Sequence, residues 1–253
     1  MFPLSDENPT ELFPFFTLII IGACAAAWFL IQGAGMDMAV MVDSVCTFGL
    51  IPAEVMGAGG AQVPTPGPSD LACRPGGLTW EAAFTSMFMH GGWGHILGNL
   101  WFLWVFGNNV EDSMGHLRFL LFYLLCGLGA AGAQVLSDPG STVPMVGASG
   151  AISGVMGAYA VLYPKVRVNT AIILIIIVRI IPLPAWVMLG YWFLIQLLAG
   201  AFGLEAGTAF WAHIGGFVAG VALVKLFENP KLVGAKRAHR RLTPAELREM
   251  GWW

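Results

Sequence analysis

Six long apolar stretches constrain what this chain can fold into more than any other feature of its sequence. A helix needs about 20 apolar residues to cross a hydrocarbon core of roughly 30 Å. Six stretches qualify, and they are Phe15–Gln32, Met87–Gly107, Leu117–Leu136, Ser149–Tyr163, Ala185–Phe202 and Ala209–Phe227. Hydrophobic residues make up 57% of the chain and charged residues only 11%, which is too little polar surface for a water-soluble globule. The sequence therefore predicts an all-α polytopic membrane protein with six transmembrane helices.

The positions of Lys and Arg favour six spans over seven. A seventh apolar stretch, Asn169–Ile181, is shorter than the others. With six spans and an inside amino terminus, eleven of the 12 Lys and Arg residues are cytoplasmic and only Arg74 lies outside, as the positive-inside rule requires. A seventh span would carry the basic cluster from Lys225 to Arg248 to the outer face. We therefore predict that residues 169–181 form an interfacial hairpin and that both termini are cytoplasmic, in a plasma or inner membrane.

The spans also divide the chain into regions. The predicted regions are a cytoplasmic amino terminus (1–14), a six-span membrane domain (15–227) that contains an outer loop (33–86), and a basic cytoplasmic tail (228–253). Two of the four cysteines, Cys46 and Cys73, lie in the outer loop. Because the compartment outside a bacterial inner membrane is oxidising, these two cysteines are candidates for a disulfide bond.

Charge and residue spacing exclude several classes of function. The net charge of −3 with only 12 Lys and Arg argues against nucleic acid as a partner, because phosphate binding needs a clustered basic face. The cysteines lack the C-x-x-C spacing of a zinc or redox site. His90 and His95 are five residues apart, which is not the i,i+4 spacing of a helical zinc pair. We expect neither a metal nor a cofactor.

Three polar side chains lie at one depth in the predicted bilayer. Ser149 and His213 lie fifteen residues, and His95 sixteen residues, before the cytoplasmic ends of their spans. At about 1.5 Å per residue, all three lie roughly 22–24 Å above the inner boundary and some 6–8 Å beneath the outer edge of the core. Taken singly, Gly147–Gly150 is a helix-packing pattern and His213 is compatible with a hydrogen-bonded core residue. Their common depth favours a site.

Small residues suit close contact between the fourth and sixth spans. Gly150 and Gly154 belong to a small-residue stripe on one span, and Gly216 and Gly220 form a G-x-x-x-G on the other. Such stripes bring helix backbones together, close enough for the short serine side chain to meet an imidazole. Asp and Glu are absent at this depth. The sequence therefore predicts a Ser-His dyad of Ser149 and His213, an arrangement suited to acyl transfer.

Three motifs together resemble the rhomboid family of intramembrane serine proteases. They are Gly147-Ala148-Ser149-Gly150, His95-x-x-x-Asn99, and Ala212-His213-x-x-Gly216-x-x-x-Gly220. Their order and their placement on the spans match the family over roughly Thr79 to Glu228. The resemblance implies a rhomboid-like bundle of six transmembrane helices.

The resemblance also implies a role for each matching residue. Ser149 would be the nucleophile and His213 the general base, while His95, Asn99 and the backbone N–H of Ser149 would form the oxyanion site. His90 matches the histidine that opens the family's second span. Two features depart from the family: the Trp-Arg motif of the first outer loop is absent, and Ser153 stands where some members have a tyrosine stacking on the base. How the imidazole is held is therefore left open.

The expected activity is hydrolysis of peptide bonds in or near transmembrane segments of other membrane proteins. Such a site needs a polar cavity that admits water, here from the outer side, with substrates reaching it sideways from the lipid bilayer. Two alternatives are a transporter and a rhomboid-like protein that binds membrane clients without cutting them. Retention of both Ser149 and His213, and the lack of paired halves typical of transporters, favour the protease.

Overall fold

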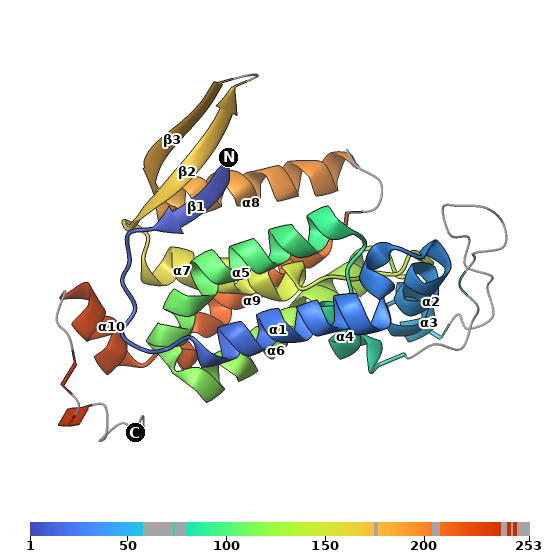
Figure 1. Cartoon of the computed structure of the whole chain (residues 1–253), viewed down its shortest axis with the longest axis horizontal. Coiled ribbons are helices and arrows are strands. Elements are labelled where there is room, and N and C mark those ends of the chain that lie inside the picture. The colour runs from blue at the N-terminus through green and yellow to red at the C-terminus, as the bar shows by residue number, and fades with distance from the viewer. Residues whose placement is uncertain are drawn as a thin grey trace.

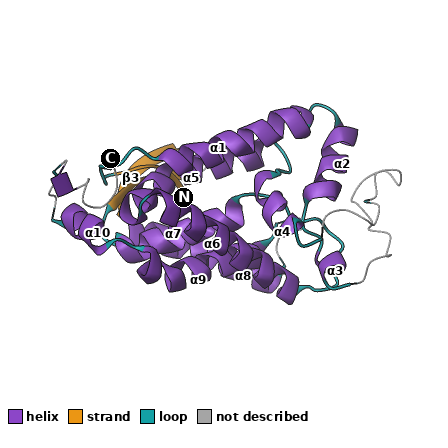
Figure 2. Ribbon diagram, turned by 90° about the horizontal axis from the view of Figure 1, so that it is seen from below, coloured by secondary structure: helices purple, strands orange, loops and turns teal. Residues whose placement is uncertain are grey.

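Long helices lying side by side form most of the structure (Figures 1 and 2). The computed structural model describes residues 1–57, 73, 79–174, 177–203, 208–238, 242–243 and 245–246. The elements that correspond to the six predicted spans are α1 (Phe15–Ala26) continued by the π-helical η1 (Ala27–Ile31), α5 (Trp93–Met114), α6 (His116–Ser137), α7 (Ser149–Leu162), α8 (Ala185–Phe202) and α9 (Phe210–Phe227). The predicted helical membrane-protein class is confirmed.

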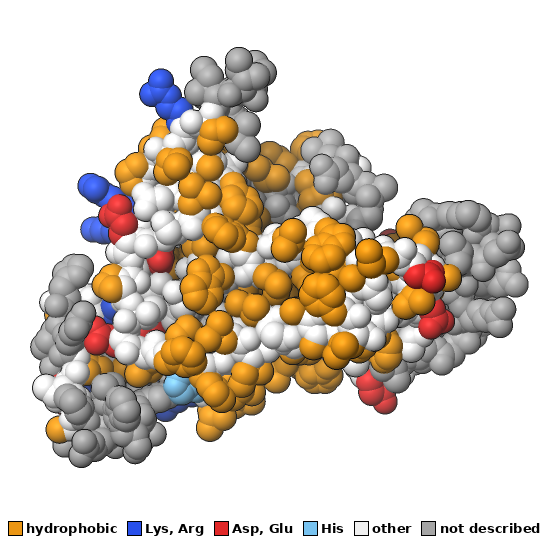
Figure 3. Space-filling model, in the orientation of Figure 1, with side chains coloured by type: hydrophobic (Ala, Val, Ile, Leu, Met, Phe, Trp, Pro, Cys, Tyr) orange, Lys and Arg blue, Asp and Glu red, His pale blue; other side chains and the backbone are white. Residues whose placement is uncertain are grey.

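Length and burial separate the helices into two kinds. Helices α6, α8 and α9 are long and apolar enough to cross a membrane. Helix α7 has only 14 residues, and most of them are buried among the other helices. On the face shown in Figure 3, hydrophobic side chains cover the middle of the molecule and the charged side chains lie toward its two ends. This distribution is the one expected of a bundle surrounded by lipid.

The second span differs from its predicted bounds. It was expected from Met87 to Gly107, but helix α5 begins at Trp93 and ends at Met114. Gly91 and Gly92 precede the helix, and the short 3₁₀ turn η4 (Ser86–Phe88) lies before them. Consecutive glycines are poor helix formers because they lose the most backbone freedom on folding. His90 therefore lies just outside the helix.

The described part of the outer loop contains short helices. They are η2 (Gly33–Gly35), α2 (Met38–Phe48), α3 (Pro52–Val55) and α4 (Ala82–Thr85). Asp37 caps α2 by accepting a hydrogen bond from the backbone N–H of Ala39 at 2.8 Å. Leu50, after α2, exchanges two backbone hydrogen bonds with Met145 in the loop between α6 and α7. Most of the Pro- and Gly-rich part of the loop, with Arg74, lies outside the described residues.

A three-stranded antiparallel sheet lies at one end of the bundle, which the sequence analysis did not anticipate as a sheet. Strands β2 (Arg167–Leu174) and β3 (Ile177–Pro184) form a hairpin, and β1 (Phe2–Asp6) pairs with β2. The Ile- and Val-rich composition of the hairpin favours strands. The two prolines of β3 are tolerated because β3 is an edge strand. The segment that was predicted not to cross the membrane is thus not helical.

One buried carboxylate holds the segment before α1 and a helix near the carboxyl end against α5. Asp112 on α5 accepts hydrogen bonds from the backbone N–H groups of Glu11 and Leu12. It also forms a 2.7 Å ion pair with Lys236 of α10 (Pro230–Arg237). Both side chains of this pair are almost fully buried. The end of the tail lies outside the described residues.

Candidate active site

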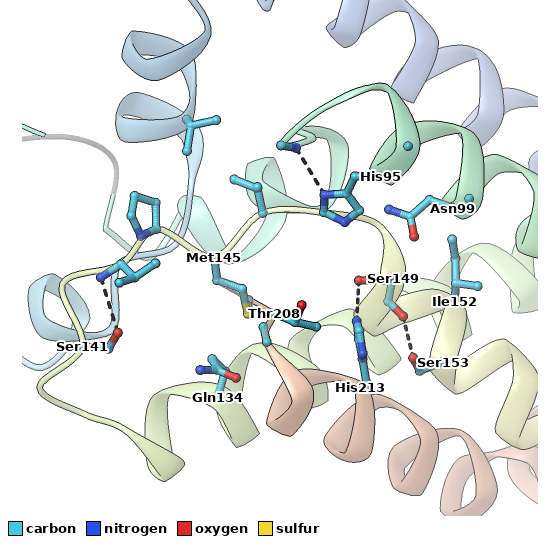
Figure 4. Close-up of a pocket in the computed structure, with 18 of the residues that line it drawn as sticks. His95, Asn99, Gln134, Ser141, Met145, Ser149, Ile152, Ser153, Thr208 and His213 are labelled. Atoms are coloured by element: carbon cyan, nitrogen blue, oxygen red, sulfur yellow. Dashed lines mark hydrogen bonds between the residues drawn. The ribbon is translucent and has the colours of Figure 1, made fainter. Parts of the chain in front are cut away.

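Ser149 and His213 meet at the ends of two helices. Ser149 is the first residue of α7 and His213 lies in the first turn of α9. The Nε2 atom of His213 lies 2.8 Å from the Oγ of Ser149 (Figure 4). This distance is within hydrogen-bond range for a nucleophile and its base. The predicted common depth of the two residues therefore corresponds to direct contact.

Glycines make this contact possible because α7 and α9 pack backbone against backbone. A Cβ atom on Gly216 would overlap the carbonyl group of Gly150, and one on Gly220 would overlap that of Gly154. A Cβ on Gly150 itself would come within 2.6 Å of the Cβ of Ala130 on α6. The two stripes identified in the sequence thus lie against each other and bring the short serine side chain within reach of the imidazole.

The imidazole of His95 is oriented by the glycines that precede α5. The backbone N–H of Gly91 donates to Nδ1 of His95 at 3.2 Å. A neutral imidazole that accepts at Nδ1 carries its proton on Nε2. That N–H is directed toward Gly147, since a Cβ on Gly147 would lie 2.6 Å from the Nε2 of His95. His95 therefore presents a hydrogen-bond donor beside the start of α7.

Asn99 lies one helical turn after His95 and adds a second donor. The residue is 7% exposed, and its Nδ2 atom has no hydrogen-bond partner among the described residues. The same hypothetical Cβ on Gly147 would lie 3.5 Å from this nitrogen. A buried donor without a partner raises the free energy of the folded state, because it has lost its hydrogen bonds to water. A ligand that accepts a hydrogen bond from Asn99 would remove this cost.

Ser149 contributes a third donor through its own backbone. Ser149 is the first residue of α7, and the first N–H groups of a helix lack partners within the helix. The positive end of the helix dipole also lies here. Gly147, just before the helix, has φ of +124°, which side-chain-bearing residues rarely adopt. This backbone turn aims the start of α7 toward His95 and Asn99.

A cavity of about 930 Å³ opens in front of these groups. Ser149, His213, His95 and Asn99 all line it, and residues of α2 and of the α6–α7 loop form other parts of its wall (Figure 4). The loop is held in place by a 2.8 Å hydrogen bond from the backbone N–H of Gly147 to the carbonyl of Ser86. The cavity is large enough to take a stretch of extended peptide.

Other predicted residues occupy the surroundings of the cavity. His90 is fully buried; its ring packs edge-on against His95 at 5.3 Å between centroids, and both of its ring nitrogens lack partners among the described residues. Its backbone exchanges hydrogen bonds with Gln32 of the first span. His90 thus packs against the ring of His95.

The two cysteines of the outer loop also reach the cavity. Cys46 and Cys73 are joined by a disulfide, and both line the cavity wall.

Two contacts of His213 come from α8 and were missed by the sequence analysis. Gln196 Oε1 lies 2.7 Å from Nδ1 of His213, and the Trp192 ring lies 5.9 Å away between centroids. Ser153, at the position of the family's tyrosine, instead donates to the carbonyl of Ser149 at 2.6 Å. The signal in the sequence that could have identified Gln196 is its polar amide within an otherwise apolar span.

Comparison with known proteins identifies the family. A family model described as the Rhomboid domain matches residues 78–229, which is more than half of the chain. The chain belongs to the rhomboid family. The matched residues include all of helices α7 and α9. As a member of this family, the chain is a membrane protein with transmembrane helices.

Named relatives of this rhomboid come from bacteria and plants. It is 31% identical to Rhomboid protease GluP of Bacillus subtilis over 158 residues, which are 60% of this chain and 27% of GluP. It is 41% identical to Rhomboid-like protein 11, chloroplastic, of Arabidopsis thaliana over 75 residues, 30% of this chain and 26% of that protein. It is 29% identical to RHOMBOID-like protein 6, mitochondrial, of the same plant over 167 residues, 62% and 50% respectively. This rhomboid thus spans half or less of each relative's length.

Proposed function

We propose that this rhomboid is an intramembrane serine endopeptidase with Ser149 as nucleophile and His213 as general base. The observation that carries the proposal is the 2.8 Å contact between Oγ of Ser149 and Nε2 of His213. Both residues line a cavity, and the hydrogen-bond donors of His95 and Asn99 line the same cavity. A hydroxyl is a weak nucleophile at neutral pH and needs an adjacent base to accept its proton. The family relationship to a protein named as a protease supports the same assignment.

In the first half of the reaction, Oγ of Ser149 bonds to the scissile carbonyl carbon while its proton moves to Nε2 of His213. The carbonyl oxygen becomes an oxyanion. When the tetrahedral intermediate collapses, the C–N bond breaks and His213 gives its proton to the leaving amine. In the second half, water attacks the acyl ester, His213 accepts a proton from that water, and the proton returns to Ser149 as the new carboxylic acid leaves.

The oxyanion is stabilised by donors that already surround the cavity wall. The Nδ2 of Asn99, the Nε2–H of His95 and the backbone N–H of Ser149 are the three candidates. Asn99 is the best supported of the three, because its Nδ2 donor has no partner among the described residues. Donors that are fixed before the reaction and aimed at developing charge give the largest catalytic effects.

The substrates we propose are transmembrane segments of other membrane proteins. The cavity opens beside Ser149 and His213, and apolar side chains cover the middle of the bundle on the face shown in Figure 3. A bond must be extended before it is attacked, so segments weakened by Gly, Pro or polar residues are preferred. The reaction requires no metal ligand or cofactor in this scheme, because His213 supplies the proton transfers.

The orientation we propose places both termini in the cytoplasm of a cell and opens the cavity to the outer side. Blue basic side chains gather at the end that carries the sheet (Figure 3); the cavity adjoins α2 at the other end. Cytoplasmic ends of membrane proteins carry the excess of Lys and Arg. Reporter fusions after Pro184 should report the cytoplasm, and a fusion there that reports the outer compartment contradicts this topology.

Labelling with a serine-reactive fluorophosphonate tests the proposal on the pure protein. The wild-type protein should be labelled and Ser149→Ala should not, because the probe reacts with an activated serine. Ser153→Ala is the matched control, since Ser153 lies one turn further along α7 and bonds to a carbonyl instead. Labelling that persists in Ser149→Ala, or a wild-type protein that does not react, contradicts an activated Ser149 and favours a membrane-protein binder.

A further inference from the structure

The second ring nitrogen of His213 faces helix α8 rather than the cavity. Gln196 lies on α8 as a buried residue, 8% exposed, and its Oε1 is 2.7 Å from Nδ1 of His213. We propose that Gln196 is a positioning residue that holds His213 in the tautomer able to accept a proton from Ser149. The inference rests on the proposed function of Ser149 and His213.

The chemistry of the two contacts determines where the imidazole proton lies. An amide oxygen only accepts hydrogen bonds, so Nδ1 of His213 must donate to Gln196. A neutral imidazole carries one proton, so Nε2 keeps its lone pair and faces Ser149 Oγ at 2.8 Å. With no acceptor at Nδ1, the proton is free to move to Nε2. In that tautomer His213 points an N–H at Ser149 and is not a base.

Helix α8 also fixes the plane of the ring. Trp192 lies four residues before Gln196 and therefore on the same face of the helix. Its ring lies 5.9 Å from the His213 ring between centroids, tilted by 40°, while Phe210 meets the ring edge-on at 6.5 Å. Ser153 makes its hydrogen bond to Ser149 instead. The support that a stacking tyrosine on α7 would give thus comes from α8.

A neutral acceptor suits this depth better than a carboxylate. A buried carboxylate must be paired or it is costly to desolvate, whereas an amide oxygen orders the proton of His213 without a net charge. Among the described residues, the titratable side chain of His95 on α5 interacts electrostatically with His213 across the cavity. A neutral partner therefore sets the tautomer of the base with little stabilisation of its charged form.

Two substitutions separate positioning from packing. Gln196→Met keeps the length and volume of the side chain and removes the acceptor, so kcat should fall about tenfold with little change in KM, as expected for loss of one buried hydrogen bond. Gln196→Glu keeps an acceptor oxygen but adds charge. It should retain most of the rate at alkaline pH and move the acid limb of the pH–rate profile to higher pH, because a carboxylate stabilises the imidazolium.

A neighbouring residue provides the matched control. Ile195 precedes Gln196 on α8 and is 40% exposed on the outside of the bundle. Ile195→Ala should keep the wild-type kcat and the wild-type pH profile. If Gln196 has only a structural role, both Gln196 variants should melt at a lower temperature, and the protein that remains folded should show the wild-type acid limb in its pH–rate profile. That result would overturn the proposal.

The tautomer can be read without any substrate. In protein labelled with ¹⁵N-histidine in detergent micelles, with His213→Ala used for assignment, His213 should be protonated on Nδ1 and not on Nε2 at alkaline pH. Protonation on Nε2, or an unchanged kcat and tautomer in Gln196→Met, overturns the proposal. If Gln196→Met does not fold, the spectrum of the wild type and the profile of Gln196→Glu decide. Cleavage that survives Ser149→Ala would instead refute the proposed function, and the spectrum would still test Gln196.

Discussion

Gly216 of α9 lies directly against the carbonyl group of Gly150 of α7, so that no side chain fits between the two backbones. Gly150 directly follows Ser149 and Gly216 lies three residues after His213, so this contact sets the separation of the two helices that carry them. Packing of small residues is the main source of association between helices in lipid, where burial of apolar surface gives little driving force.

Gly216→Ala should therefore destabilise the bundle. The added methyl group meets backbone rather than a flexible side chain, and overpacking of this kind costs about 1–3 kcal/mol. The measurement is thermal unfolding in detergent. Gly132→Ala on α6 is the matched control, because nothing lies within 4 Å of its Cβ position. Equal melting temperatures for the two variants would contradict the close contact.

Asn99→Ala should lower turnover and leave the fold assembled. Removing one donor to an oxyanion typically costs about 2.7–4 kcal/mol, or roughly 100- to 1,000-fold in rate. Stability should change little because Nδ2 has no partner among the described residues. Asn108→Ala, on the same helix but outside the cavity lining, is the control for cleavage. A loss of melting temperature in step with activity would instead mean that Asn99 ties helices together.

The stability of the end that carries the sheet should depend on the protonation of Asp6. Burial of Asp6 raises its pKa from 3.8 to about 6, against the lowering effects of a hydrogen bond from Tyr159 and the nearby charge of Lys236. The folded state then binds a proton more tightly than the unfolded state, so the stabilisation from this group is present at low pH and is lost as pH rises through about 6.

Thermal unfolding of Asp6→Asn between pH 5 and pH 7.5 tests this linkage. Asparagine imitates the protonated acid, so the melting temperature of the variant relative to the wild type should be higher at pH 7.5 than at pH 5. Glu7→Gln removes a carboxylate from the same segment and serves as the control. A difference between Asp6→Asn and the wild type that does not vary with pH would show that Asp6 titrates alike in both states.

The disulfide between Cys46 and Cys73 should stabilise the described part of the outer loop. A bond that closes a loop of 27 residues is typically worth about 2–4 kcal/mol. Reductant should lower the melting temperature of the wild type and leave that of the double variant Cys46→Ala/Cys73→Ala unchanged. Mass mapping without reductant should find the two cysteines linked, and alkylation of both would refute the bond.

Sequence reasoning reached the pairing of Ser149 with His213 because both lie on spans that run in the same direction, where depth follows directly from residue counts. The contact of Gln196 with His213 was not predicted, because α8 runs in the opposite direction and its sequence carries no motif that marks Gln196. The start of α5 at Trp93 depended on the local backbone at Gly91 and Gly92 rather than on hydropathy. The pairing of β1 with β2 joins segments about 165 residues apart, and such non-local contacts leave no periodic signal.

Cleavage of a model transmembrane substrate in liposomes tests the central assignment most directly. The wild type, Ser149→Ala, His213→Ala and the double variant are compared in the same lipid, with Ser153→Ala as a control for the fold. Ser149→Ala and His213→Ala should each abolish cleavage, and the double variant should be hardly worse than either, because the two residues act as a unit. Wild-type cleavage by Ser149→Ala would contradict the assignment of this site as a serine protease.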